Sequence, residues 1–576
     1  MKSLLLFILG SLIFAFVLQS ESRTQTPNRK LKSIEEAELR TAATKAIKLI
    51  QRAQSVWYQK ETCTSCHHQL LPQIPFSLAR ERGVQLDEKA ARETTATSFA
   101  FLKDLDSVVQ GYDYIDVMFD GWALTTASRA GIRPSPTTDA EAQFIASRQL
   151  PDGSWPTVDD RPPQSSSLFT VTAVCAEAVR QYMPERFNVE RETRLRLARQ
   201  WFLKAQPRTT EDRTFQLFGL KWARADQDTL KKAARRLIAE QREDGGWSQL
   251  PSLSSDAYST GEALVALRDV GAIETGDPAY QRGLRFLLGN QQSDGSWVLK
   301  SRLHPPAPVS PPYVNTEFPP FQHDQFISIM ATSWAASALL EAVPSRTDIA
   351  KQPALADIAP TAQEKWIHVA LNGSTAELRK LLDAGMNANA KTAQGTSALM
   401  LAARDLEKVK LLIDRGADVD ARSAAGVTPL MVAARYRGNV EVVRLLLKKE
   451  AKVIPDKSVE VRNDASALFF AAAAGDVQTV SALLDAGAKV DQRMTLLGQF
   501  SISPLNYTIS LGDPALIDYL ISKGADPNEV DNDQISMLSW ATIANQGRVV
   551  QALLARGAKV NHVDKFGMTP LLYAAS

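Results

Sequence analysis

Hydrophobic and polar residues follow one another along the first part of the chain with the period of amphipathic helices. Between about residues 34 and 342, apolar residues recur at helical spacing, whereas the short alternating runs typical of strands are scarce. The pattern predicts an all-α region whose helices include the segments 34–58, 140–149, 171–182, 190–205, 215–225, 229–240, 257–270, 279–290 and 326–342.

Three of these predicted helices run into the same tail, in which a glutamine is followed by Asp-Gly and a tryptophan. The copies read QLPDGSW from Gln149, QREDGGW from Gln241 and QQSDGSW from Gln291, and a decayed fourth copy is expected at Gln206. Asp-Gly favours a tight turn, and the glutamine amide and the indole N–H can tie a helix end to its neighbour. Helical hairpins fastened to one another are therefore expected, with unrelated tryptophan-rich turns as the alternative.

These tails resemble the repeats of squalene–hopene cyclases and of related prenyltransferase-like domains. The segment SDAYSTGEALVAL at residues 255–267 is also similar to an inner helix of that family. The resemblance implies an α/α toroid over residues 34–342. In such a toroid, inner and outer helices form a ring and the tails staple successive hairpins.

The second part of the chain carries a different repeat, with a period near 33 residues. Ala-Leu, Pro-Leu or Met-Leu pairs place leucines 31, 38, 37, 33 and 33 residues apart, at Leu399, Leu430, Leu468, Leu505, Leu538 and Leu571. Most of the apolar helices between these pairs stop at Gly-Ala, where glycine can take the left-handed conformation that ends a helix.

These units resemble ankyrin repeats, each a turn followed by two short helices. The resemblance implies a C-terminal ankyrin solenoid of about six repeats over residues 363–576, the last one incomplete, with a HEAT-like solenoid as the alternative. Residues 343–362 contain three prolines and no sustained apolar period, so we expect them to form the linker between the toroid and the repeats.

Composition narrows the range of partners. The 576 residues carry a net charge of +2, and 23% of them are charged. No strong electric field is then available to attract nucleic acid or an anionic membrane surface. We expect a protein partner that binds through the ankyrin repeats and no nucleic-acid partner. The cyclase resemblance adds an apolar ligand in the toroid as a candidate.

The N-terminal segment has the features of an export signal. Lys2 supplies a positive charge, residues 4–17 are almost entirely apolar, and polar residues follow. An apolar run of this length is short for a membrane span, which needs roughly 20 residues. We expect a signal peptide at residues 1–22 of a bacterial protein, which places the rest in the periplasm or at the cell envelope. An uncleaved signal anchor is the alternative.

The sequence CTSCH at residues 63–67 is the attachment signature of c-type haem. Two thiols at this spacing, Cys63 and Cys66, can bond the haem vinyl groups, and His67 then lies where its imidazole can coordinate the iron. We expect a covalent haem c at these three residues. A disulfide or redox pair, or a metal site that includes His67 or His68, remains open as an alternative. Candidates for the sixth iron ligand are Met118, Met183, Met330 and His323.

The cyclase resemblance also calls for a catalytic acid, which that family supplies from an Asp-x-Asp-Asp cluster. The chain lacks this cluster, and the nearest string ends in Asp159 and Asp160 within a proline-rich loop. The spacing of Asp113, Asp116 and Asp120 allows one shared helix face, for which solvent exposure is the favoured interpretation. Cys175 lies among small apolar residues and is expected to be a buried structural cysteine.

Two functions follow from these features. The first is an exported protein-binding protein with a haem c on a non-catalytic toroid, suited to electron transfer; the second is a terpenoid cyclase or prenyltransferase relative acting on an isoprenoid or other apolar ligand. The missing acid cluster favours the first. Hairpin tips and the concave helix face of the ankyrin repeats are expected to contact the partner, with four candidate residues: Arg422, Tyr436, Arg493 and Asp531.

Overall fold

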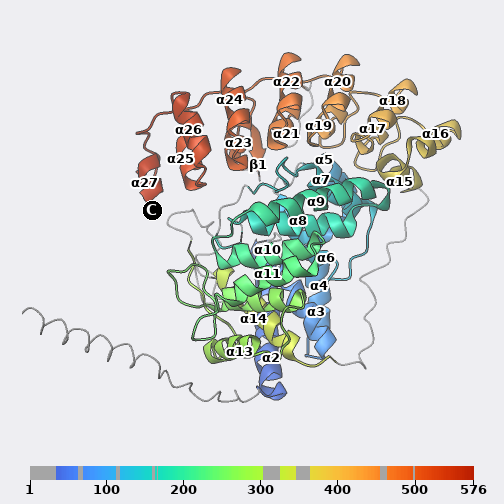
Figure 1. Ribbon diagram of the computed structural model, residues 1–576. Helices are drawn as coiled ribbons and strands as arrows, with labels where there is room; N and C mark the ends of the chain where they lie inside the picture. Colours follow the sequence, from blue (N-terminus) through green and yellow to red (C-terminus); the bar gives the residue numbers. More distant parts are fainter. Residues whose placement is uncertain are drawn as a thin grey trace, which may run out of the picture. The chain divides into compact units, whose positions relative to one another are not determined.

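The computed structural model describes most of the chain, and the regular secondary structure of the described residues is almost entirely helical (Figure 1). The described residues are 34–61, 69–111, 117–157, 162–164, 166–302, 325–345, 364–454, 464–496 and 500–575. Residues from Glu36 onward belong to one compact unit. The expected all-α fold class is confirmed, since the described residues contain only one short pair of strands.

Six helices of the first part contact one another in sequence, and the last of them contacts the first, which closes a ring. These inner helices are α3 (Gln73–Arg82), α6 (Val117–Ala127), α8 (Leu168–Tyr182), α10 (Thr210–Trp222), α12 (Ala257–Asp269) and α14 (Gln325–Ala342). Each follows an outer helix: α2 (Glu36–Glu61), α4 (Glu88–Ser98), α7 (Pro136–Ser147), α9 (Asn188–Lys204), α11 (Gln227–Ile238) and α13 (Pro278–Asn290). We refer to this ring as the toroid.

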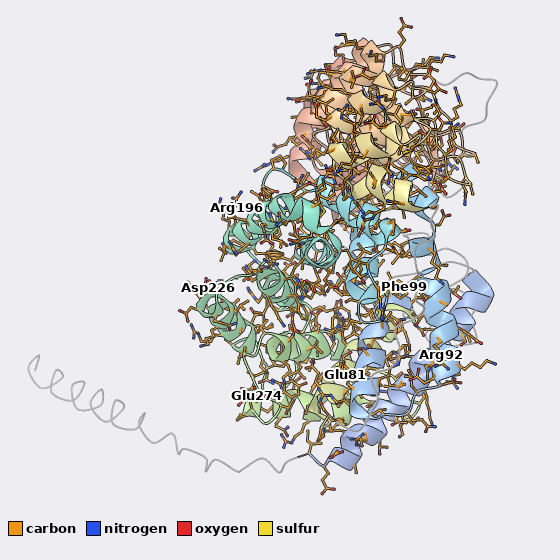
Figure 2. The ribbon with its side chains drawn as sticks, turned by 90° about the vertical axis from the view of Figure 1, so that its right-hand side faces the viewer. Glu81, Arg92, Phe99, Arg196, Asp226 and Glu274 are labelled. Carbon is orange, nitrogen blue, oxygen red and sulfur yellow. The ribbon has the colours of Figure 1, made fainter. Side chains whose placement is uncertain are left out.

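The distribution of apolar residues explains which helices lie inside. Helix α12 is buried on nearly every side, whereas α11 buries only a stripe formed by Leu230, Ala234 and Leu237. A helix with one apolar stripe covers the outside of a core, and one that is apolar all round lies within it. In Figure 2, Arg196 on α9 and Asp226 at the start of α11 accordingly lie on the outer edge of the toroid.

The nine helices predicted from periodicity all occur in the structure, with ends shifted by a few residues. Helix α7, for example, begins at Pro136 rather than 140, because the hydroxyl of Ser135 caps it. The pattern does not predict three helices of the toroid, α3, α4 and α6. Helix α6 is buried on all sides and therefore has no helical period, and α4 has few large apolar residues.

The three glutamine–tryptophan tails make the same contacts. Each glutamine Nε2 donates to the carbonyl of the glycine in its own tail and to a carbonyl of the next outer helix: Gln149 to Arg194 at 2.9 Å, Gln241 to Ala279 at 2.7 Å and Gln291 to Ala42 at 3.0 Å. Each indole donates to the end of its own outer helix, from Trp155 to Ile145, Trp247 to Leu237 and Trp297 to Leu287. The predicted role of the tails as staples is confirmed.

The third staple joins the two ends of the ring, because Ala42 lies on the first helix and Gln291 follows the last outer one. Gly295 has a φ of +97°, and a Cβ there would lie 2.6 Å from the carbonyl carbon of Lys45. The expected fourth copy at Gln206 does not form, because no glycine and tryptophan follow it. Its exposed side chain donates to the carbonyl of Lys204, and no other partner of it occurs among the described residues.

The second part of the chain is a stack of short helix pairs (Figure 1). The pairs are α15 (Glu364–Asn372) with α16 (Thr375–Asp383), α17 (Ala398–Leu401) with α18 (Leu406–Asp414), α19 (Pro429–Ala434) with α20 (Val440–Lys448), α21 (Ala467–Ala473) with α22 (Val477–Asp485), α23 (Pro504–Leu511) with α24 (Pro514–Ser522), and α25 (Met537–Ile543) with α26 (Gly547–Ala555); α27 (Pro570–Ala575) follows. Strands β1 (Met494–Leu496) and β2 (Phe500–Ile502) pair antiparallel.

Five of the six leucines that mark the repeats are buried in the stack. Leu399, Leu430, Leu468, Leu505 and Leu538 are at most 3% exposed, whereas Leu571 on α27 is 76% exposed. Each of the first five packs between neighbouring repeats, which is how a solenoid buries a continuous core.

Several residues singled out by their sequence lie outside the described part of the chain. They are residues 1–22, the motif of Cys63, Cys66 and His67, the carboxylates Asp113, Asp116, Asp159 and Asp160, and most of the segment 343–362. Among the helices that are described, none combines the length and apolar character that crossing a bilayer requires.

Candidate functional site

The inner helices of the ankyrin repeats contact the toroid through a buried arginine. Arg435, directly after α19, is 4% exposed and donates from Nη1 to the carbonyls of Val108 and Val109, both at 2.7 Å. These carbonyls belong to α5 (Leu105–Gln110), a short helix that packs on the toroid helix α7. The last carbonyls of a helix lack partners within it. The guanidinium also lies 4.4 Å from the ring centre of Phe144 on α7, within cation–π range.

A second arginine joins the next pair of elements. Arg404, after α17, donates from Nη1 to the side chain of Gln143 at 3.0 Å and from Nη2 to the carboxylate of Glu190 at 3.0 Å. It also lies 5.3 Å from the ring centre of Tyr436. One side chain thus connects α7 and α9 of the toroid to two ankyrin repeats.

Further polar contacts extend this surface toward the first repeat. Asn372 donates to Asp139 at 2.6 Å and accepts from Gln143 at 2.9 Å. Arg186 of the toroid donates to the carbonyl of Asn372 and to the carboxylate of Asp405, both at 3.0 Å. We call the whole contact between the toroid and the ankyrin inner helices the toroid–ankyrin interface.

The interface also includes the fifth repeat and the turn that follows the first repeat. Arg148, directly after α7, is 4% exposed and hydrogen-bonds Tyr507 on α23. Gln110 donates to Thr396 at 2.7 Å, and the hydroxyl of Thr392 bonds Asp106. Side chains from the first, second, third and fifth repeats therefore contact the first part of the chain.

Burial perturbs the ionisation of several groups at this interface. It raises the pKa of Asp139 to about 7, although the bond from Asn372 opposes the shift. It also raises the pKa of Glu141 to about 7, against the charge of Arg435 and a hydrogen bond with Asp120. The pKa of Arg148 falls to about 10 for the same reason. Burial disfavours the charged form of each group.

The structure separates the four candidate protein-binding residues into two environments. Tyr436 is 5% exposed, and its ring lies 6.5 Å from that of Phe144, so the toroid covers it. Arg422, Arg493 and Asp531 lie on the segments between repeats and are partly exposed. Asp531 accepts from the indole of Trp540 at 2.9 Å and from two backbone amides of its own turn. The concave helix face is thus occupied at Tyr436, and Thr392 on the first hairpin segment already bonds Asp106. The later hairpin segments, residues 420–426, 491–496 and 528–534, which we call the hairpin side, are partly exposed at Arg422, Arg493 and Asp531.

A buried carboxyl pair inside the toroid escaped prediction from the sequence. Glu211 on α10 and Glu262 on α12 are 2% and 0% exposed and interact directly. Thr170 donates to Glu211 at 2.6 Å and Tyr258 donates at 2.8 Å. Neither oxygen of Glu262 has a donor among the described residues. Two carboxyl groups in contact can hydrogen-bond only if one keeps a proton.

The surroundings of this pair favour the protonated form. Burial raises the pKa of Glu262 well above its ordinary value, and the charge of Glu211 adds to the effect. Burial raises the pKa of Glu211 as well. In the sequence, the pair is visible only as one glutamate on each of the two inner helices α10 and α12. This pattern differs from the Asp-x-Asp-Asp cluster of the cyclases.

Other predicted residues are placed as follows. Cys175 is fully buried on α8, as expected, with its Sγ 3.3 Å from the carbonyl of Val117. Asp120 is 3% exposed on the inner helix α6, so the expectation of a solvated face was wrong for this residue. The inner position of α6 turns Asp120 toward Glu141 rather than toward solvent. Within the described part of the chain, no cluster of three or more histidine, cysteine or acidic residues has a metal-binding arrangement.

Comparison with known proteins identifies the C-terminal repeats. The family described as ankyrin repeats (3 copies) matches residues 366–456, 405–494 and 505–576. The ankyrin repeat, SAM and basic leucine zipper domain-containing protein 1 is 32% identical over 106 residues in Mus musculus and over 105 residues in Homo sapiens. Each match covers 18% of this chain and 21% of that protein. The C-terminal region therefore consists of ankyrin repeats, which are protein-binding modules.

A local likeness to a cyclase is also present. The squalene–hopene cyclase of Alicyclobacillus acidocaldarius is 42% identical over 75 residues, which is 13% of this chain and 12% of the cyclase.

The human ASB11 ankyrin repeat domain is a similar solved structure, with a TM-score of 0.33 and 23% identity over 36% of this chain and 91% of that domain. The chain thus spans about a fifth or less of the length of these curated relatives.

Proposed function

We propose that this chain is a protein-binding protein whose ankyrin repeats recognise a partner from the hairpin side while the toroid occupies their inner helices. The observation that supports this is the toroid–ankyrin interface itself. Arg404 and Arg435 already bind a protein surface there, with buried hydrogen bonds and cation–π contacts. A second protein has access to the partly exposed segments between repeats, where Arg422, Arg493 and Asp531 lie.

Cross-linking of the full chain in a native extract tests this proposal. A captured partner should cross-link to residues 420–426, 491–496 or 528–534, and paired substitutions Arg422→Ala and Asp531→Ala should weaken its capture. Tyr436→Phe is the matched control, because it removes only a hydroxyl from a ring that the toroid covers. Cross-links confined to the toroid, with capture unchanged by the paired substitutions, would place recognition in the other part of the chain.

The proposal includes export to the periplasm or cell envelope and a haem c, which would suit the protein to electron transfer. This part rests on the sequence of residues 1–22 and on Cys63, Cys66 and His67. If haem is bound covalently, Cys63 and Cys66 would hold it through thioether bonds and His67 would coordinate its iron, and the group would supply a one-electron couple. Expression with a cytochrome c maturation system should give a Soret band that survives acid–acetone extraction. A disulfide or two titratable thiols instead of that band would contradict the haem assignment.

A second candidate function is favoured by one observation, the carboxyl pair of Glu211 and Glu262. A carboxyl group that stays protonated inside an apolar site can act as a general acid. The candidate is therefore an enzyme that protonates an isoprenoid or other apolar ligand in the toroid. Incubation with squalene and with a polyprenyl diphosphate decides between the two. A cyclised product that disappears in Glu262→Gln but not in Glu243→Gln, an exposed control, would establish the enzyme.

A further inference from the structure

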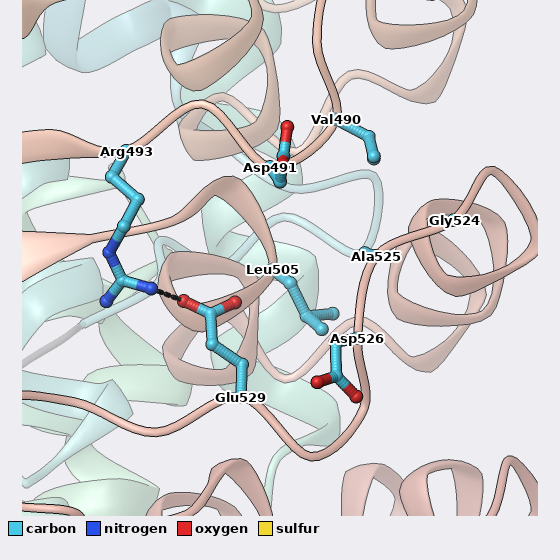
Figure 3. A pocket seen from close by; sticks show the side chains of 8 residues that line it. All are labelled: Val490, Asp491, Arg493, Leu505, Gly524, Ala525, Asp526 and Glu529. Atoms are coloured by element: carbon cyan, nitrogen blue, oxygen red, sulfur yellow. Dashed lines mark hydrogen bonds and ion pairs between the residues drawn. The ribbon is translucent and has the colours of Figure 1, made fainter.

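A cavity of about 300 Å³ lies between two successive ankyrin repeats (Figure 3). Val490, Asp491 and Arg493 follow α22, and Leu505 belongs to α23. The remaining wall, Gly524, Ala525, Asp526 and Glu529, follows α24. Asp491, Arg493 and Glu529 place one wall of the cavity on the hairpin side of the repeats, which the proposed function assigns to partner binding.

One wall of the cavity is held in place by its own contacts. Arg493 forms an ion pair with Glu529 and donates from Nε to the hydroxyl of Ser501 at 2.8 Å. Ser503 donates to the other oxygen of Glu529 at 2.6 Å. These bonds occupy the only positive side chain in the lining and leave it neutralised by its partner.

The remaining lining combines negative charge with apolar surface. Figure 3 shows the carboxylates of Asp491 and Asp526 on either side of Leu505. Leu505 is 1% exposed, and Val490 adds a second aliphatic side chain. Three carboxylates and one guanidinium line the cavity, which gives it a formal charge of −2. A negative pocket with an apolar floor suits a cation on an aliphatic stem.

Asp491 differs from the residues at the same position of other repeats. Counted from the glycine after the second helix, the equivalent residues are Asn389, Asp420 and Asn528. Each of them accepts a hydrogen bond from a backbone amide of the following repeat, from Asp418 at 2.7 Å, Lys452 at 2.8 Å and Lys559 at 2.8 Å.

No such bond joins Asp491 to the next repeat in the described part of the chain, where the corresponding amide would be that of Asp526. Among the described residues, the bond that joins neighbouring repeats at Asn389, Asp420 and Asn528 is thus missing at Asp491, where the cavity opens. Within the described part of the chain, the Asp491 carboxylate at the rim of the cavity is therefore available to a ligand, which can donate a charge-assisted hydrogen bond to it.

We propose that this cavity binds a lysine or arginine side chain of a basic segment in the partner protein. The aliphatic stem would pack against Val490 and Leu505, and the cationic head would lie between Asp491 and Asp526. This inference rests on the proposed function, because it names the chemistry by which the hairpin side recognises a protein.

Peptide display on the full chain tests the proposal. A library of random twelve-residue peptides, selected on the wild-type protein, should become enriched in peptides with a lysine or arginine that cannot be replaced by alanine. The double substitution Asp491→Asn with Asp526→Asn should weaken their binding about tenfold or more, and added salt should weaken binding to the wild type. Both replacements keep an oxygen that can accept a hydrogen bond, as Asp526 does from Asn528.

The control removes two charges outside the cavity. Glu407 and Glu441 lie on the second helices of other repeats, with side chains 66% and 65% exposed. Glu407→Gln with Glu441→Gln changes the net charge equally and should leave peptide affinity within twofold of wild type. Equal losses in both double variants would show general electrostatic attraction and overturn the cavity as the site.

Failure of this inference can be distinguished from failure of the proposed function. Peptides that bind residues 420–426 or 528–534 without needing lysine, arginine or Asp491 would overturn the cavity while the hairpin side remains a protein-binding surface. If no peptide is selected and no partner cross-links to the hairpin side, both proposals are wrong.

Discussion

Arg404 holds Glu190 through one guanidinium nitrogen, which donates to both carboxylate oxygens at 3.0 and 3.2 Å. The residues are 214 positions apart, one in the ankyrin repeats and the other on the outer toroid helix α9. Their side chains are 19% and 28% exposed, so water and salt still reach the pair. Such a pair contributes about 1 kcal/mol or less, and the buried contacts beside it must supply more of the stability of the interface.

Arg435 provides the first test of that interface. Arg435→Met should lower the free energy of unfolding by about 3 kcal/mol, because two carbonyls lose their donor and buried Glu141 loses a nearby positive charge. Urea denaturation measures the change. Arg444→Met, whose side chain is 58% exposed, should stay within about 0.5 kcal/mol of wild type. Equal effects of the two substitutions would show that Arg435 at the interface stabilises the protein no more than an exposed arginine does.

Closure of the ring predicts opposite effects for two neighbouring glycines. Gly295→Ala should destabilise the protein by about 2 kcal/mol or more, because a methyl group meets the backbone of Lys45 and φ is +97°. Gly289→Ala, on α13 with open space around it, should stabilise by roughly 0.5–1 kcal/mol. Thermal unfolding of both variants measures the difference. If Gly295→Ala leaves the stability of the protein unchanged, the third staple does not hold the ends of the ring together.

Asp139 makes the toroid–ankyrin interface sensitive to pH. Its pKa is about 7 in the folded protein and 3.8 ordinarily, so the folded state holds the proton more tightly. The stabilising contribution is complete below pH 3.8 and is lost as pH rises through about 7. Asp139→Asn should therefore reduce the fall in unfolding free energy between pH 5 and 8, a fall of at most about 1.4 kcal/mol per pH unit for one site.

Urea denaturation at several pH values checks this change in slope. Part of the slope should remain in Asp139→Asn, because Glu141 also has a pKa of about 7. Asp228→Asn, on the exposed first turn of α11, should keep the full wild-type slope. If Asp139→Asn also keeps the full wild-type slope, ionisation of the Asp139 carboxyl group does not affect the stability of the interface.

The carboxyl pair predicts a second, separate pH effect. The raised pKa of Glu262 means that stability falls as pH rises above the ordinary value of 4.5. Glu262→Gln should remove this loss and make the protein more stable than wild type at neutral pH, because the amide can donate to Glu211 without a shared proton. Infrared difference spectra across the same pH range should lose a protonated carboxyl band in the variant. A band that persists would place the proton on another group.

Residue periodicity was sufficient to predict helices and repeats, but not every helix. The glutamine–tryptophan tails and the repeated leucines predicted local contacts, because a tail closes onto its own helix and a leucine packs against the next repeat. Helix α6 gave no signal, since a helix that is apolar on all sides has no period. The glutamine at Gln206 led to a wrong prediction. Without the glycine turn and the tryptophan, its side chain cannot form the staple contacts.

The sequence by itself determined the all-α class, the staples and the ankyrin stack, because these depend on side chains close together in the chain or repeated at a fixed period. Only the tertiary structure decided which surfaces meet. Glu211 and Glu262 come together because neighbouring inner helices of the ring contact each other. Arg435 hydrogen-bonds Val108, which is 327 positions away, and no repeat or motif in the sequence predicts this contact. Burial then sets the ionisation of Asp139 and Glu141, since the cost of a buried charge depends on what covers it.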